Sequence, residues 1–133
     1  MIEAPKIVTN RQVTDHFLFE ECTCRCCNRL KITPEFFRHM AKLEELRREL
    51  GLPVIVNSAY RCPDHNKAVG GVGDSWHLRF ATDIRPGDGS PESLRRMYRI
   101  ALVQGWGGIG LYDTFIHLDL RQETARWDKR STA

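Results

Sequence analysis

His77, Asp83 and His117 are the residues of this chain whose types and spacing could bind a catalytic metal ion. Each lies at the edge of an expected strand, beside a turn and away from any expected helical surface. Two imidazoles and one carboxylate suit zinc, which in enzymes takes three protein ligands and leaves the fourth position to water. On spacing alone, separate structural roles in a turn, a cap and a half-buried strand are the commoner explanation.

The cysteines are a second group that could do chemistry. Cys22, Cys24, Cys26 and Cys27 fall within six residues, and Cys62 stands alone. An odd count argues against a complete disulfide framework, and the second cysteine or histidine pair of a zinc ribbon or finger is absent from the sequence. Reduced thiols, a bridge to Cys62 and a thiolate metal site are therefore the three interpretations of this group.

Two amphipathic helices are expected to support these residues. Thr33 and Ser90 are typical N-caps, and each precedes a proline at the first helical position. Apolar residues then recur every three or four positions until Gly51 and Gly105, where each helix is expected to end.

Short apolar runs predict strands at residues 54–56, 81–84, 108–112 and 115–120. One or two helical turns at 63–69 and a glycine-rich turn at 70–74 connect the first two strands, and Asp113-Thr114 suits a tight hairpin between the last two. The sequence therefore predicts an α+β domain, with helices on one face of a mainly antiparallel sheet.

A length of 133 residues fits one domain. We expect a packed arm at 1–32, a core at 33–121 and a polar tail at 122–133 that frays, apart from Trp127. A net charge of +3 is too small for a dedicated nucleic-acid binder, so no nucleic-acid partner is expected. We also expect the protein to be a monomer. No apolar run is long enough to span a membrane, and the first residues lack the layout of a secretory signal, so we expect a protein that is cytoplasmic as synthesised.

Six sequence segments follow one another in an order that is typical of one protein family. They are Asn57-Ser58-Ala59-Tyr60-Arg61, residues 66–72, Ser75-x-His77, Ala81-x-Asp83-Ile84, Gly107-Gly108-Ile109-Gly110 and Phe115-Ile116-His117-Leu118-Asp119. Over roughly residues 14–121, cysteines included, the chain resembles the zinc D-Ala-D-Ala carboxypeptidase family of peptidoglycan peptidases, in particular its compact members from phages and prophages.

The resemblance implies a role for each matching residue. The three candidate ligands would hold zinc, and a zinc-bound water would attack the amide bond. Arg61 would bind the carboxylate of the substrate through its planar guanidinium, and Tyr60 and Ser75 would contribute to substrate binding.

The chain departs from the family pattern at two places. The segment from Ser75 to Asp83 is one residue shorter than the family pattern and lacks its glycine. If the missing residue belongs to a turn, His77 and Asp83 can still converge. If it belongs to the strand, the side chain of Asp83 turns to the other face of the sheet. Thr114 stands where relatives have the general base. Asp119 is expected to replace it, with Asp113 as a substitute, and orienting a metal-bound imidazole is the alternative role of Asp119.

The resemblance thus predicts a zinc peptidase that acts on a peptidoglycan stem peptide or its precursor and reaches the wall after phage-type release. Both carboxypeptidases and endopeptidases occur among such relatives. The alternative is a catalytically inactive zinc-binding module, as in hedgehog signalling domains, that acts in binding or as a phage structural component. A nucleic-acid-binding module built on the cysteines is the least favoured interpretation.

Overall fold

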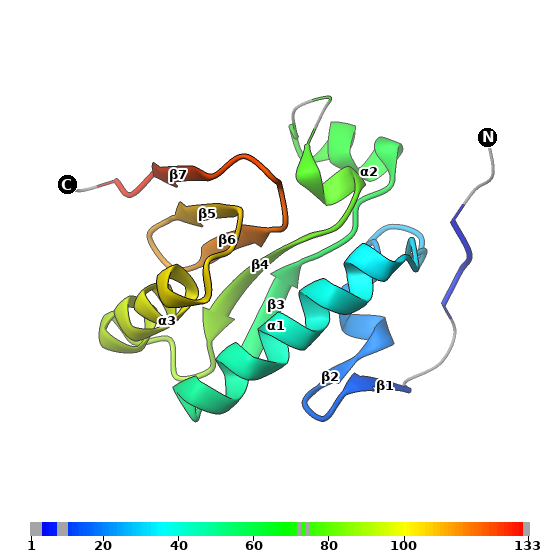
Figure 1. Ribbon diagram of the computed structural model, residues 1–133. Coiled ribbons are helices and arrows are strands. Elements are labelled where there is room, and N and C mark those ends of the chain that lie inside the picture. The colour runs from blue at the N-terminus through cyan, green and yellow to red at the C-terminus, as the bar shows by residue number, and fades with distance from the viewer. Residues whose placement is uncertain (1–3, 8–10, 72, 74, 132–133) are drawn as a thin grey trace.

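The computed structural model describes residues 4–7, 11–71, 73 and 75–131. A five-stranded sheet with the strand order β3-β4-β6-β5-β7 forms its centre (Figure 1). The strands are β3 (Val54–Ser58), β4 (Ala81–Pro86), β5 (Gly108–Leu111), β6 (Ile116–Asp119) and β7 (Ala125–Asp128). Neighbouring strands are antiparallel except β5 and β7, which run parallel. The predicted α+β fold with a mainly antiparallel sheet is confirmed.

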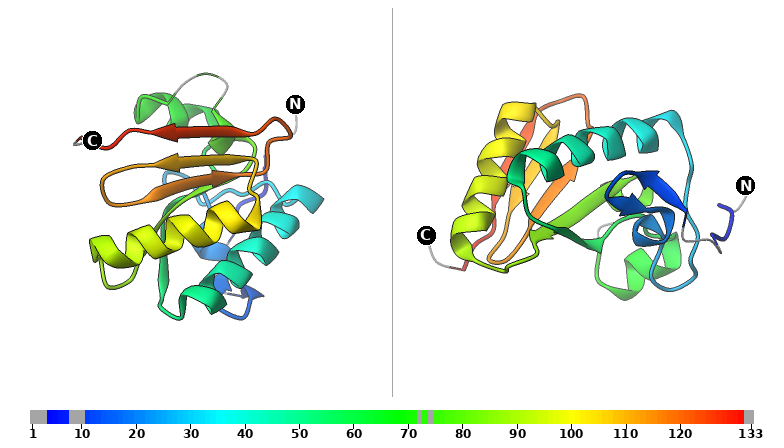
Figure 2. Two further views of the ribbon diagram at one scale, coloured as in Figure 1. Left: turned by 60° about the vertical axis from the view of Figure 1, so that its left-hand side comes forward. Right: turned by 90° about the horizontal axis from the view of Figure 1, so that it is seen from below.

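Both long helices pack on the same face of this sheet (Figures 1 and 2). They are α1 (Pro34–Leu50) and α3 (Pro91–Gln104). The hydroxyls of Thr33 and Ser90 each accept the backbone N–H three residues further on, and both Gly51 and Gly105 have a φ of +73°. The predicted caps are therefore confirmed at both ends of both helices. In the part of the chain that the structure describes, no helix is long and apolar enough to cross a membrane.

The alternation of side chains along the strands separates a core face from an open face. Ile116 and Leu118 of β6 are fully buried in the core shared with α1 and α3. Such burial stabilises the fold by roughly 1.5–3 kcal/mol per side chain. His117 and Asp119 alternate with these residues and therefore point to the opposite face, away from the two helices.

The connection between β3 and β4 contains two short elements, α2 (Pro63–Ala68) and the 3₁₀ turn η2 (Trp76–Leu78). The expected helical turns at 63–69 are thus present. Of the expected glycine turn, Gly70 has a φ of +76°, and Val72 and Asp74 lie outside the described residues.

The N-terminal arm packs against α1. It contains the hairpin strands β1 (Gln12–Thr14) and β2 (Phe17–Leu18), followed by the 3₁₀ turn η1 (Phe19–Cys22). The carboxylate of Glu44 on α1 accepts hydrogen bonds from the Thr14 hydroxyl and the backbone N–H of His16. Phe19 stacks on Phe36 with a distance of 5.9 Å between ring centroids.

The expectation that the tail frays is wrong, because residues 125–128 form β7 along the exposed edge of β5. The backbone N–H of Lys129 continues this pairing by donating to the carbonyl of Leu111 at 2.7 Å. An edge strand with one exposed face needs few apolar residues, so the polar composition of β7 gave no indication of a strand in the sequence. Trp127 faces the open side of the sheet, over Gly110.

Candidate metal centre

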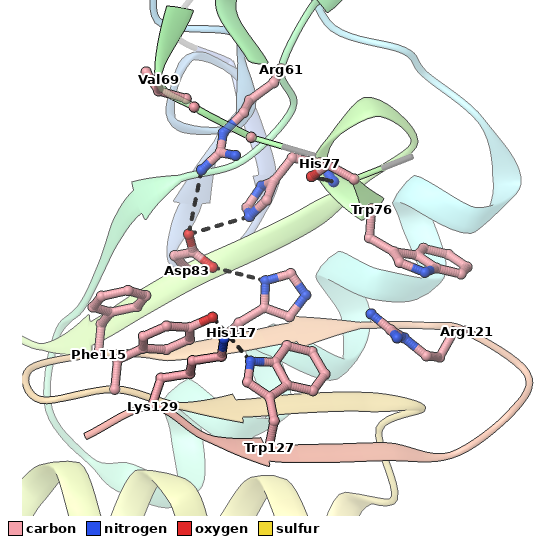
Figure 3. Close-up of a pocket in the computed structure, with 14 residues that line it drawn as sticks. Arg61, Val69, Trp76, His77, Asp83, Phe115, His117, Arg121, Trp127 and Lys129 are labelled. Carbon is pink, nitrogen blue, oxygen red and sulfur yellow. Dashed lines mark hydrogen bonds and ion pairs between the residues drawn. The ribbon is translucent and has the colours of Figure 1, made fainter. Parts of the chain in front are cut away.

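Three side chains meet on the open face of the sheet (Figure 3). Asp83 of β4 and His117 of β6 are direct partners in the antiparallel ladder, so their side chains share one face. His77 reaches the same point from η2. The Oδ1 atom of Asp83 lies 3.0 Å from Nδ1 of His117, and its Oδ2 atom lies 3.2 Å from Nε2 of His77.

The ligand atoms converge although the segment between Ser75 and Asp83 is short. The hydroxyl of Ser75 accepts the backbone N–H of His77 and so caps η2. The chain then enters β4 in a register that pairs Asp83 with His117. Asp83 therefore stays on the open face, as the first of the two sequence alternatives requires.

Each imidazole is held from behind by an acceptor. The Nδ1–H of His77 donates to the carbonyl oxygen of Ala59 at 2.7 Å, which leaves Nε2 facing Asp83. On the other ring, Nε2 of His117 lies 2.7 Å from Oδ2 of Asp119, and Nδ1 faces Asp83. Acceptors of this kind fix the orientation and tautomer of metal-binding histidines.

The two carboxylates remain ionised although both are buried. Burial alone would raise the pKa of Asp83, but hydrogen bonds from His117 and His77 hold it well below its usual range. Burial likewise opposes ionisation of Asp119, whereas hydrogen bonds from Arg121 and His117 lower its pKa. Burial would lower the pKa of His117, and its bonds to Asp119 and Asp83 outweigh that effect and raise it.

The three atoms that face one another suit a metal ion. His77, Asp83 and His117 each offer one ligand atom, and these atoms lie within 4.8 Å of one another. Tetrahedral zinc with bonds of about 2.0–2.2 Å separates its ligand atoms by roughly 3.3–3.6 Å, a little more than the 3.0 Å and 3.2 Å between the Asp83 oxygens and the two imidazole nitrogens. The donor set of two imidazoles and one carboxylate, with each imidazole anchored from behind, therefore fits zinc.

Arg61 lies directly above this group (Figure 3). Its Nη2 atom is 3.8 Å from Oδ2 of Asp83, and its backbone N–H donates to the carbonyl of His77 at 2.8 Å. The side chain is oriented by Nε, which donates to the Ser58 hydroxyl at 3.3 Å. A guanidinium held here can bind a carboxylate next to the metal position.

An open cleft of about 770 Å³ contains the group. The described residues that line it are Arg61, Val69, Gly70, Gly71, Ser75, Trp76, His77, Asp83, Tyr112, Phe115, His117, Arg121, Trp127 and Lys129. Three of them, Arg61, Arg121 and Lys129, carry a positive charge, whereas Asp83 is the only carboxylate among them. The cleft therefore favours anionic ligands.

Sequence reasoning missed the aromatic wall of this cleft. Tyr112 and Phe115 stack in parallel with ring centroids 4.5 Å apart, and the indole Nε1–H of Trp127 donates to the Tyr112 hydroxyl at 3.0 Å. The position of Tyr112 and Phe115 on either side of the predicted Asp113-Thr114 turn could have indicated that their rings lie together. The position of Trp127 depends on the pairing of β7 with β5, which no local sequence pattern predicts.

Some of the expected site residues lie outside the cleft. Tyr60 is buried and lines a different cavity, together with Cys26 and Cys62. Asp119 is fully buried behind His117. Asp113 lies at the far end of the hairpin, where its carboxylate accepts hydrogen bonds from Ser131.

Comparison with known protein families supports a functional interpretation of this site. A family model described as Peptidase M15 matches residues 15–119, which include all three ligand-type residues. A search of curated proteins found no match.

Proposed function

The chain belongs to the peptidase M15 family, a family of metallopeptidases, and we propose that it is a zinc-dependent peptidase that hydrolyses an amide bond of a peptidoglycan stem peptide or its precursor. The observation that carries the proposal is the convergence of Nε2 of His77 and Nδ1 of His117 on Asp83 at the base of the cleft. Both rings are oriented by hydrogen bonds on their far sides, to the Ala59 carbonyl and to the Asp119 carboxylate.

His77, Asp83 and His117 hold the ion in this proposal. Zinc, when bound, supplies a Lewis acid that polarises a carbonyl group and lowers the pKa of a coordinated water to about 7. The ionised state of Asp83 contributes the negative charge that a divalent cation requires. The Ala59 carbonyl and the Asp119 carboxylate keep the two imidazoles in the orientation needed for binding.

Arg61 selects the substrate. Its guanidinium reaches into the cleft beside Asp83, so a peptide whose terminal carboxylate binds there places its last amide bond over the metal position. Lys129 adds positive charge to the cleft, which suits the carboxylates of a stem peptide, whereas the charge of Arg121 is offset by Asp119. The stacked rings of Tyr112 and Phe115 offer an apolar surface to the remaining side chains.

One observation favours a second candidate function. Among the described residues that line the cleft, Asp83 is the only carboxylate, and it is a metal ligand in our proposal. Both oxygens of Asp119 are engaged by Arg121, so we assign Asp119 to positioning His117 rather than to proton transfer. A zinc-binding module of the same fold without peptidase activity is therefore the alternative.

An assay of the zinc-loaded protein separates the two functions. The protein is incubated with a stem pentapeptide that ends in D-Ala-D-Ala and with cross-linked muropeptides, and the products are identified by mass spectrometry. Release of D-alanine indicates a carboxypeptidase, and cleavage elsewhere in the peptide indicates an endopeptidase. Activity should disappear in His117→Ala and persist in His65→Ala, which changes a histidine outside the cleft. Zinc binding without any product would support the inactive module instead.

A further inference from the structure

Four sulfur atoms from two distant segments converge beside Arg61. Cys24, Cys26 and Cys27 belong to the N-terminal arm, whereas Cys62 follows Arg61 directly; we refer to these residues as the cysteine cluster. The Sγ atom of Cys26 lies 3.5 Å from that of Cys24 and 3.3 Å from that of Cys62. All four sulfurs lie within 4.8 Å of one another.

This spacing fits a shared metal ion better than a disulfide. A disulfide joins two sulfurs at about 2.05 Å and would leave the other two thiols of the cluster facing it. A tetrahedral zinc ion bound at about 2.3 Å from each thiolate keeps neighbouring sulfurs roughly 3.8 Å apart. The observed separations, from 3.3 Å up to a limit of 4.8 Å, span that distance.

The backbone around the cysteine cluster supports thiolates. Asn28, with a φ of +60°, closes a tight turn by donating its N–H to the carbonyl of Cys24 at 2.8 Å, and this turn brings the Cys24 and Cys27 side chains together. The N–H of Cys62 donates to the sulfur of Cys24 at 3.3 Å, and that of His65 donates to the sulfur of Cys62 at 3.4 Å. Donors of this kind favour the charged form of sulfur, which is the form that binds metals.

Charged side chains also suit an anionic metal–thiolate group at this place. Arg29 and Lys31 line the same cavity as three members of the cysteine cluster, with Asp64 as the acidic residue of that cavity. Four thiolates around one divalent ion carry a net negative charge. The two cations partly offset this charge, and their own sum with Asp64 remains positive.

A metal ion here would act on the neighbouring cleft through the backbone. Cys62 adjoins Arg61, whose N–H donates to the carbonyl of His77, and the carbonyl of Ala59 in the same loop holds the His77 ring. The arm contacts this loop through a hydrogen bond from the Tyr60 N–H to the Cys22 carbonyl at 3.2 Å. Joining the arm and the loop through the cysteine cluster would fix the loop that positions both Arg61 and His77.

We infer that Cys24, Cys26, Cys27 and Cys62 form a second metal site, a structural thiolate site that takes Zn²⁺ and fastens the N-terminal arm to the loop of Arg61. Four protein ligands leave no open position for water, which is the arrangement of structural rather than catalytic zinc. Whether this site binds zinc does not depend on whether the cleft has peptidase activity.

Metal content in matched variants tests this inference. Protein reconstituted with zinc under reducing conditions should contain two zinc ions per chain by elemental analysis. The double variant Cys24→Ser/Cys62→Ser should keep one, whereas Cys22→Ser should keep both, because Cys22 lies outside the cluster and its sulfur bonds to the carbonyl of Leu18. His77→Ala should lose the ion of the cleft and keep the other. Wild-type protein with a single zinc that His77→Ala removes would overturn the inference.

Cobalt spectroscopy gives a readout that needs no cysteine variant. Titration of the metal-free wild-type protein with Co²⁺ should produce the intense near-ultraviolet charge-transfer absorption of thiolate–cobalt bonds, which a site of histidine and aspartate does not give. Absence of that absorption, or a Cys26–Cys62 disulfide in protein kept under reducing conditions, would refute the thiolate site. Because the readout is absorption, its failure is distinguishable from failure of the peptidase proposal.

Discussion

The Nε2 atom of His117 lies 2.7 Å from Oδ2 of Asp119, on the opposite side of the imidazole from Asp83. Asp119 is fully buried, and Arg121 donates to its two oxygens through Nε at 2.8 Å and Nη2 at 2.7 Å. Its carboxylate therefore contacts the back of the ring and not the cleft. This relationship makes Asp119 a positioning residue for the candidate zinc ligand His117.

Removal of the Asp119 carboxylate should weaken zinc binding. Asp119→Ala is expected to lower the affinity of the cleft site by about 10–100-fold, the usual effect of losing a partner behind a metal-bound imidazole. Asp119→Asn keeps an acceptor for the Nε2–H and should lower the affinity less. Competition against a chromogenic chelator measures both, with the cysteine cluster replaced by serines so that one site is read.

A different result would identify Asp119 as the general base. In that case zinc affinity would be unchanged in Asp119→Asn, while kcat would collapse and the acidic limb of the pH–rate profile would disappear.

Arg61 should determine the preference for a free terminal carboxylate. Arg61→Lys keeps the charge but loses the planar fork, so KM for a peptide acid should rise by about tenfold or more, whereas KM for the matching peptide amide should change little. Arg85→Lys is the control, since Arg85 bonds to Asn57 and does not line the cleft. Equal effects of Arg61→Lys on acid and amide would refute carboxylate recognition.

Gly110 should be needed to seat Trp127 against the sheet. A Cβ atom at Gly110 would overlap the indole of Trp127, whose ring centroid lies 5.2 Å from that of His117. Gly110→Ala should therefore destabilise the fold by about 1–3 kcal/mol in urea unfolding and shift tryptophan fluorescence to the red. Gly73→Ala, which meets no atom within 4 Å, should change neither property. A Gly110→Ala protein as stable as the wild type would contradict the observed packing.

Local physics explains which elements the sequence could predict. Both long helices were predicted with their caps because Thr33, Ser90, Gly51 and Gly105 act within one turn of their own positions. The pairing of β7 with β5 joins segments that are distant in the chain, and its polar edge strand carries no local signal.

The candidate site likewise contains residues that the sequence could predict and residues that it could not. His77, Asp83 and His117 could be selected by residue type and by order along the chain, and the structure brings them together. Of the partners behind them, the Ala59 carbonyl could not be predicted, because a backbone carbonyl has no side-chain signature. Asp119 was selected from the sequence with two alternative roles, and the choice between them depends on its burial and its bonds to Arg121.

Glu44 should couple stability to pH. Burial alone would raise its pKa, but hydrogen bonds from Thr14 and His16 lower it below the unfolded value of about 4.3. Because the pKa of Glu44 is lower in the folded state, its ionised carboxylate stabilises the fold at pH values above the unfolded pKa. This stabilisation is lost as the pH falls through the folded pKa. Glu44→Gln should therefore be less stable than the wild type at neutral pH and approach it in acid.

Urea unfolding at several pH values measures this difference. Glu45→Gln, the exposed neighbour of Glu44, should unfold like the wild type at every pH. A deficit of Glu44→Gln that does not change with pH would contradict the role of the ionised carboxylate.

Anomalous X-ray diffraction on either side of the zinc absorption edge tests the central claim most directly. Crystals of the zinc-loaded protein should show a zinc peak at about 2.0–2.2 Å from Nε2 of His77, Nδ1 of His117 and a carboxylate oxygen of Asp83. A map of fully loaded crystals with no zinc peak among these three residues would contradict the metallopeptidase account.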